Sequence, residues 1–314
     1  MKKVILDTDT AGDDTLAILT VLDSPELELL GLTIAGGNVQ FEQQVENALY
    51  TLEIAGVSGK VPVYKGHAQA MMGDHQTVEE VHGDDGMGNA YFPKAVQRAE
   101  EDKHAVDFII EQAHKHPGEL TLLAIAPLTN IAMALLKDPS IVKKIEHLYI
   151  MGGTNNALGN VTPAAEFNFL VDPEAAKIVM HAGLPITMVG WEMATRYSVM
   201  TEEDHRQVRE LGTKGATFFT DINKVVEQFN TDVHRLPGTT HPDSLLVAIA
   251  GNPKIMTDSH RYYVDVETKG ELTRGYSLVD VNGRLGKEPN VHVCEMVDVR
   301  LFKDTLLNAL KNIT

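Results

Sequence analysis

The chain has 314 residues and carries 44 acidic against 27 basic side chains, which gives a formal net charge of −17 at pH 7. This excess of negative charge disfavours binding to nucleic acid and to anionic membranes, and a small neutral or cationic substrate fits it better. The one cysteine, Cys294, excludes an intramolecular disulfide and is typical of a reducing compartment. No stretch approaches the ~20 consecutive apolar residues of a membrane span, and no apolar signal segment precedes the first strand, so we expect a cytoplasmic protein.

Strand-like and helix-like stretches alternate over the first two thirds of the chain. The predicted strands cover residues 4–6, 29–35, 61–64, 120–125, 147–151 and 186–189. The predicted helices cover residues 15–22, 42–55, 99–116, 128–136 and 173–182. This alternation predicts a Rossmann-like α/β fold, in which a mostly parallel central sheet carries helices on both faces.

The pattern loosens after Trp191. Helices are predicted over residues 201–211, 216–230 and 301–313 and from residue 244 onward, and strands that would extend the sheet over residues 262–266, 277–281 and 291–293. The long irregular region 66–93 is typical of a lid or a binding loop. Because no repeat or linker is recognisable, we expect residues 1–314 to form a single domain.

Four aspartates, Asp7, Asp9, Asp13 and Asp14, lie between the first predicted strand and the first predicted helix. The carboxyl end of a strand is where open α/β sheets bind ligands. Carboxylates this close repel one another, and a hard divalent cation such as Ca²⁺ or Mg²⁺ would offset that repulsion. The stretch holds no His or Cys, which argues against zinc. The simpler interpretation is that Asp13 or Asp14 caps the helix and the other acids are solvated.

Further polar residues follow later elements. Asn38 follows the second strand, and the carbonyls before the helix at residue 128 follow the fourth, where they could ligate a hard cation. Glu166 and Asn168 would point to one side of an extended segment and bind adjacent sugar hydroxyls, while the flanking phenylalanines point into the core. Each pattern also has an ordinary structural explanation, as a turn or as a half-exposed strand.

Two segments that contain histidine allow more than one interpretation. Asp243 precedes an apolar helix and is either a cation ligand or a helix cap. His241 is either a proton donor near neutral pH or a solvated loop residue. The acidic segment that starts at His82 is predicted to be a flexible lid.

Together these motifs resemble the inosine-uridine preferring nucleoside hydrolase family over nearly the full length of the chain. The family's amino-terminal signature, Asp-x-Asp-x-Gly-x-Asp-Asp, is represented by residues 7–14, in which Thr10 and Ala11 are a mild departure. The other matches are residues 37–38, 82–83, 85–88, 127–130, 151–153, 160, 166–168, 172–173 and the segment that holds His241 and Asp243.

The resemblance implies Ca²⁺-dependent hydrolysis of the N-glycosidic bond of ribonucleosides to free base and ribose. It implies that the cation is held by Asp9, Asp14, Asp243 and the backbone carbonyl of Ile125. It implies that the substrate is bound by Asp13, Asn38, His82, Met151, Asn160, Glu166 and Asn168. Asp13 would be the base that activates a metal-bound water, with Asn168 and His241 as further catalytic residues. The family also implies a homodimer or a homotetramer.

The adjacent carboxylates of Asp13 and Asp14 have a physical reason for different roles. At a helix start they diverge by about 100°, so one can bind the cation while the other faces the attacking water. A separate carboxylate base is needed because Ca²⁺ acidifies water much less than Zn²⁺ does.

The sequence does not decide which residue protonates the leaving group. Pro242 separates His241 from Asp243, whereas the family's commonest form has His directly before Asp. Trp191 is equally consistent with a base contact and with packing, so the preferred base is not predicted. Two alternative functions are a Mg²⁺-dependent phosphohydrolase of the haloacid dehalogenase type that uses Asp7, and a non-catalytic nucleoside or ribose binder.

Overall fold

The structure is a computed structural model that describes residues 1–73, 76–100 and 102–314. Residues 74 and 75 belong to the region predicted to be irregular, and residue 101 belongs to the helix predicted over 99–116. These three positions lie outside the described residues.

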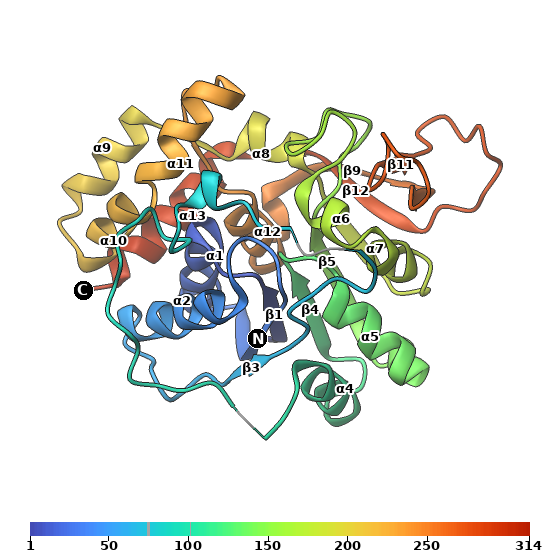
Figure 1. The fold of residues 1–314 in the computed structure, drawn as a ribbon, viewed down its shortest axis with the longest axis horizontal. Coiled ribbons are helices and arrows are strands. Elements are labelled where there is room, and N and C mark those ends of the chain that lie inside the picture. The colour runs from blue at the N-terminus through green and yellow to red at the C-terminus, as the bar shows by residue number, and fades with distance from the viewer. Residues whose placement is uncertain (74–75, 101) are drawn as a thin grey trace.

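A mostly parallel sheet forms the centre of the molecule, with the strand order β3-β2-β1-β4-β5-β6-β12-β9 (Figure 1). Its strands are β1 Lys2–Thr8, β2 Leu27–Ile34, β3 Val63–Lys65, β4 Leu120–Ala124, β5 Ile145–Met151, β6 Ile186–Val189, β9 Met256–Tyr262 and β12 Val291–Val297. Neighbouring strands are parallel except β12 and β9, which are antiparallel at one edge. The predicted α/β fold is confirmed.

Helices pack on both faces of the sheet (Figure 1). One face carries α1 Gly12–Asp23, α2 Phe41–Ile54, α12 Pro242–Gly251 and α13 Val299–Asn312, and the other carries α4 Ala105–Lys115, α5 Thr129–Lys137 and α7 Pro173–Met180. In β1, Val4 and Leu6 join the first apolar core and Ile5 joins the second, because successive side chains of a strand point to opposite faces. Each such fully buried side chain contributes roughly 1.5–3 kcal/mol.

The strand order reverses between β1 and β4. From β1 the chain builds β2 and β3 toward one edge, and it then returns to β4 and continues through β5 and β6 toward the other edge. Ligands bind open α/β sheets at such a reversal, beyond the carboxyl ends of the strands. The loops that follow β1, β2, β4 and β5 open at this same edge, since these strands are parallel.

The helix predicted over residues 216–230 is divided into α10 Lys214–Ile222 and α11 Lys224–Phe229, and a π-helical turn, η2 Asn230–His234, follows. Asn223 ends α10, and its side-chain amide donates to the carbonyl of Phe219 at 2.8 Å. An amide side chain that bonds the backbone in this way competes with continuation of the helix.

The segment around Glu166 is not the extended strand that its alternation predicts. It forms a short helix, α6 Phe167–Val171, and the Glu166 carboxylate accepts hydrogen bonds from the backbone N–H groups of Asn168 and Phe169. The carboxylate is therefore the helix N-cap, which satisfies amides that the first turn leaves without a partner.

Two other predicted boundaries differ. The helix predicted over residues 99–116 begins only at Ala105. The strand predicted over residues 262–266 is divided, because β9 ends at Tyr262 and β10 Val264–Val266 leaves the main sheet to pair with β11 Ser277–Val279. The Asn290 side chain accepts from the N–H of Val264 at this break.

The remaining elements are short. They are α3 Glu79–His82, η1 Pro139–Lys143, α8 Trp191–Tyr197, β7 Val199–Thr201, α9 Glu202–Glu210, β8 Gly238–Thr240 and η3 Pro253–Ile255. Among the helices of the described residues, none combines the length and the apolar character that a bilayer crossing requires.

Candidate functional site

An aspartate cluster lies where the strand order reverses. Asp9 follows β1, Asp13 and Asp14 occupy the first turn of α1, and Asp243 occupies the first turn of α12, which packs against α1. Oxygen atoms of Asp13, Asp14 and Asp243 lie within 4.8 Å of one another. The fold therefore brings together carboxylates from opposite ends of the sequence.

Neighbouring donors hold two of these carboxylates in place. Asp14 accepts the Thr8 hydroxyl at 2.6 Å and the Ala11 backbone N–H at 3.0 Å. Asn38 donates its backbone N–H to Asp9 Oδ2 at 2.9 Å and its side-chain amide to Asp14 Oδ2 at 3.1 Å. Asp14 thus does cap α1, as the simpler interpretation proposed, but capping leaves the other acids unexplained.

The charge of the cluster is not balanced by the protein. Asp9, Asp14 and Asp243 are buried, and the buried atoms Asp9 Oδ1 and Asp13 Oδ1 have no hydrogen-bond partner in the part of the chain that the structure describes. Over the same residues, no lysine or arginine forms an ion pair with any of the four acids. Burial raises the pKa of Asp13 to about 6 and that of Asp14 to about 7, and it raises the pKa values of Asp9 and Asp243 well above their usual range.

These carboxylates need protons or a cation, because isolated buried charges are costly. Every donor atom in the cluster is an oxygen, which suits a hard cation such as Ca²⁺ or Mg²⁺. Ile125, just beyond β4, borders the same cavity as Asp13 and Asp243. The predicted ligand residues therefore fit a metal ion, with unpartnered buried oxygens as the observation that favours it.

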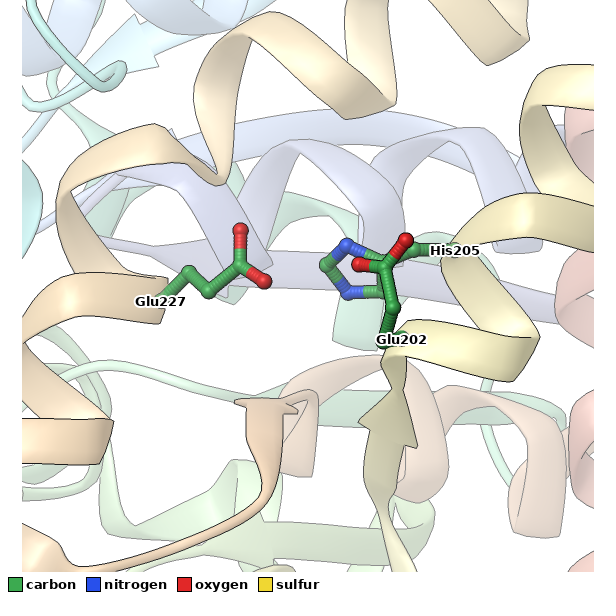
Figure 2. Close-up of side chains that lie close together, drawn as sticks. All are labelled: Glu202, His205 and Glu227. Atoms are coloured by element: carbon green, nitrogen blue, oxygen red, sulfur yellow. The ribbon is translucent and has the colours of Figure 1, made fainter.

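A second group of potential ligands lies outside this cluster. Figure 2 shows Glu202 and His205 from α9 and Glu227 from α11 facing one another. Glu202 is exposed and pairs with Arg209, while the His205 ring bonds the Thr239 hydroxyl at 2.9 Å. Solvent and neighbouring side chains stabilise the charges of this group, unlike those of the aspartate cluster, so the group does not require a cation.

A cavity opens beside the aspartate cluster. All seven residues predicted to bind the substrate line it, namely Asp13, Asn38, His82, Met151, Asn160, Glu166 and Asn168. They come from the first turn of α1, the loop after β2, the end of β5 and the loop that follows it, and the short helices α3 and α6 with the N-cap residue of α6. The structure therefore assembles the predicted set, whereas Asp9 and Asp14 lie behind the cavity wall.

Glu166 and Asn168 form one rigid wall of the cavity. The Glu166 carboxylate accepts the N–H groups of Gly153 at 2.8 Å and Asn168 at 3.0 Å. Burial raises the pKa of Glu166 to about 7, and these backbone hydrogen bonds oppose the increase. The Asn168 amide donates to the carbonyls of Met151 at 3.1 Å and Ile125 at 3.3 Å, so its orientation is fixed before any ligand enters.

An aromatic cluster lines another part of the cavity, which forms its aromatic end. Trp191 and Phe229 line it together with His234, whose ring lies 5.5 Å from that of Trp191 and 5.2 Å from that of Phe229. This end suits a flat heteroaromatic ring. Trp191 therefore does border the cavity, as does Asn230, whereas Arg235 is not among the lining residues.

Several lining residues could not be found from the sequence. Asn223, Val226 and Thr240 border the cavity because the α10–α11 break and β8 fold over it. Their residue types are common in any helix or strand, and no motif marks them. Only their tertiary position gives them a role.

His241 does not lie where a leaving-group acid must lie. Its ring is buried, bonds the Thr239 hydroxyl at 2.7 Å, and packs 5.5 Å from the ring of Phe219. Burial lowers the pKa of His241 to about 3, and the residue does not line the cavity. The residues on either side, Thr240 and Pro242, do line the cavity. This geometry does not support the catalytic role predicted for His241, which stays a prediction.

His82 does line the cavity, at the end of α3. Its Nδ1 atom lies 3.9 Å from Asp13 Oδ1, and burial lowers the pKa of the imidazole to about 4. The neutral ring is thus placed at the aspartate end, beside the proposed base. The lid function predicted for the segment that begins there stays a prediction.

Asp7 is unsuited to the phosphohydrolase alternative. Its carboxylate is buried below the cavity, where Oδ1 accepts the Thr33 hydroxyl at 2.5 Å and the Asn130 amide at 2.9 Å. It does not line the cavity and cannot meet a phosphate there.

Comparisons with known proteins agree with this geometry. Residues 4–304 match the sequence profile of a family described as inosine-uridine preferring nucleoside hydrolase. An inosine-uridine preferring nucleoside hydrolase from Leishmania major is 36% identical over 313 residues, which cover 99% of this chain and 98% of the relative. A pyrimidine-specific ribonucleoside hydrolase from Escherichia coli is 32% identical and covers 96% and 94% of the two chains.

A solved structure shows the same fold. The purine-preferring ribonucleoside hydrolase from Gardnerella vaginalis superposes with a TM-score of 0.91 at 36% identity and covers 99% of both chains. The names of these relatives include both purine and pyrimidine preferences, so likeness alone does not select a base for this chain.

Proposed function

We propose that this chain, which belongs to the inosine-uridine preferring nucleoside hydrolase family, uses Ca²⁺ as its metal and Asp13 as its general base. The chain is a nucleoside hydrolase, an enzyme that acts on N-glycosyl bonds. The observation that supports the metal most strongly is the buried Oδ1 atom of Asp9, a proposed ligand, which has no hydrogen-bond partner among the described residues.

The proposed ligands are Asp9, Asp14, Asp243 and the Ile125 carbonyl. Their oxygen-only chemistry and their burial favour a cation that tolerates several carboxylates, which is typical of Ca²⁺. When bound, the cation would make a neighbouring water more acidic and would orient hydroxyl groups of the sugar.

Asp13 is suited to accept a proton. Its carboxylate lines the cavity, and Oδ1 has no partner among the described residues. Burial raises the pKa of Asp13, which makes this carboxylate a better base than a fully solvated aspartate. Asp13 would take a proton from the water that attacks the anomeric carbon.

Asn38, Asn160, Glu166 and Asn168 would bind and orient the ribose. Cleavage of a glycosidic bond passes through an oxocarbenium-like state, in which the sugar gains positive charge. The Glu166 carboxylate and the oriented amide of Asn168 are fixed at one wall of the cavity, so they can stabilise this charge without reorganising. The aromatic end would then receive the base.

The wider organisation is also proposed. Residues 1–314 would form one catalytic domain, which acts in the cytoplasm as a homodimer or homotetramer. Its partner would be the nucleoside, with no role for nucleic acid or membrane, consistent with the net charge of −17.

A turnover panel tests the proposal. Inosine, adenosine, uridine and cytidine are incubated with the enzyme, with and without a calcium-selective chelator, and the free base and ribose are separated by chromatography. We expect release of both products, loss on chelation, and recovery when Ca²⁺ but not Mg²⁺ is returned. Full activity in the chelator would contradict the metal assignment.

A further inference from the structure

We propose that His234 is the acid that protonates the departing base, through its Nε2 atom. The inference rests on the proposed function, because that function places the ribose at the aspartate end of the cavity and the base at the aromatic end. His234 lines the aromatic end from η2, and its Nε2 atom is buried without a hydrogen-bond partner among the described residues.

The position of His234 is unlike that of the other candidate histidines. His82 also lines the cavity, but it lies beside Asp13 at the ribose end. His241 is buried in the core against Phe219 and does not reach the cavity. Because an acid must be within hydrogen-bond reach of the atom it protonates, His234 is the histidine with the required placement.

Asn230 determines which ring nitrogen of His234 keeps its proton and which one can donate a proton. The Asn230 amide N–H₂ donates to the Gly238 carbonyl at 3.1 Å, which turns its oxygen toward the imidazole. That oxygen lies 3.2 Å from His234 Nδ1. An amide oxygen can only accept, so Nδ1 must hold a proton. The imidazolium therefore carries its transferable proton on Nε2, and the ring left after transfer is the tautomer that Asn230 already stabilises.

The surroundings of the ring favour transfer. Burial between Trp191 and Phe229 lowers the pKa of His234, and the backbone at Asn160 opposes this effect. A lower pKa makes the imidazolium a stronger acid toward the base and also lowers the fraction of the enzyme that carries it at neutral pH. Arg235 follows in a left-handed conformation and lies outside the cavity lining, so it does not compete for the base.

The proton balance of the step is complete. The bond between the anomeric carbon and the base nitrogen breaks, and its electron pair goes to the base, which takes the proton from His234 Nε2. The attacking water forms the new carbon–oxygen bond and gives one proton to Asp13. Asp13 then releases this proton to solvent, and His234 regains one from solvent, so the net reaction is nucleoside plus water to base plus ribose.

Two substrates distinguish the loss of this acid from damage to the rest of the site. Inosine needs a protonated leaving group, whereas the p-nitrophenolate of p-nitrophenyl β-D-ribofuranoside departs as a stable anion without a proton. In His234→Gln, we expect kcat/KM for inosine to fall about 10²–10³-fold, as for loss of general-acid catalysis. We expect kcat/KM for the nitrophenyl riboside to change by less than about threefold, since the same hydrolytic machinery remains.

Three controls make the outcome decisive. His260→Gln, at an exposed histidine of β9, should leave both substrates unaffected, and a thermal melt should show His234→Gln to be folded. Asn230→Leu removes the acceptor for Nδ1 and should reproduce the substrate-selective loss to a smaller degree.

Equal losses on both substrates, or no loss on inosine, would overturn the assignment of His234. Failure of the wild-type enzyme to hydrolyse either riboside would instead overturn the proposed function, so the two failures are distinguishable.

Discussion

Asp13 of α1 and Asp243 of α12 place carboxylate oxygens within 4.8 Å of each other, although they come from opposite ends of the sequence. Both residues line the cavity, where α12 packs against α1. Asp243 is buried, whereas Asp13 is partly exposed. These are the two parts of the proposed site, since Asp243 would help to hold a cation and Asp13 would act on water.

Asp13→Ala should separate these two parts. Because Asp13 is not among the proposed ligands, we expect Ca²⁺ binding to persist while kcat falls about 10²–10⁴-fold through loss of the general base. Steady-state kinetics and a calcium titration on the same preparation check this prediction. Glu26→Gln, at an exposed acid, is the matched control. Unchanged turnover would remove Asp13 from the role of base.

Asn168→Ala should weaken transition-state stabilisation. The variant loses the amide that donates to the carbonyls of Ile125 and Met151 and that faces the substrate site. We expect kcat/KM to fall roughly 10–100-fold, which corresponds to about 1.4–2.7 kcal/mol. A change confined to KM would show instead that Asn168 binds ground state and transition state equally.

Metal-free stability should depend on pH through Asp7. Burial raises the pKa of Asp7 in the folded protein from 3.8 to about 7, so the folded state retains a proton that the unfolded state loses. The stability contribution of Asp7 therefore falls as pH rises from about 4 to about 7, by at most about 4 kcal/mol.

Asp7→Asn removes this ionisation. We expect its melting temperature, relative to that of the wild-type protein, to be higher at pH 8 than at pH 5 in metal-free buffer. Calorimetric melts at the two pH values provide the measurement, with Glu26→Gln as the control. A difference that is the same at both pH values would mean that Asp7 does not titrate over this range.

His241→Ala tests whether this histidine has a catalytic role. Its ring packs on Phe219 and bonds the hydroxyl of Thr239, which His205 also contacts. Truncation should cost about 1–3 kcal/mol of stability, because it leaves buried polar partners unsatisfied. Activities on inosine and on the nitrophenyl riboside should fall by similar factors. A loss specific to inosine would restore His241 as the leaving-group acid.

Much of the fold was predictable because its signals are local. The alternation of apolar strands and amphipathic helices predicted the parallel sheet, and the acids at residues 9–14 follow β1 directly in the sequence. In the sequence, Asn38 follows a predicted strand and Asp243 precedes a predicted helix. Both residues lie at the same cleft. Their convergence follows from the parallel arrangement of β1, β2 and β4.

The aromatic end of the cavity was not predictable in the same way. The orientations of His234 and His241 depend on how α10, α11 and η2 pack over the sheet, and residue spacing does not encode that packing. Glu166 was misjudged because a short capped helix and an extended strand can share the same alternation of polar and apolar residues. Both errors arise where tertiary contacts decide the local conformation.

A calorimetric titration of the metal-free protein with Ca²⁺ tests the central claim most directly, since everything proposed for the site depends on the aspartate cluster holding one hard cation. We predict one ion bound per chain by the wild-type protein and none by Asp243→Asn, with the folded state of the variant verified by its thermal melt. The absence of binding in the wild-type protein, or identical binding in the variant, would contradict the account.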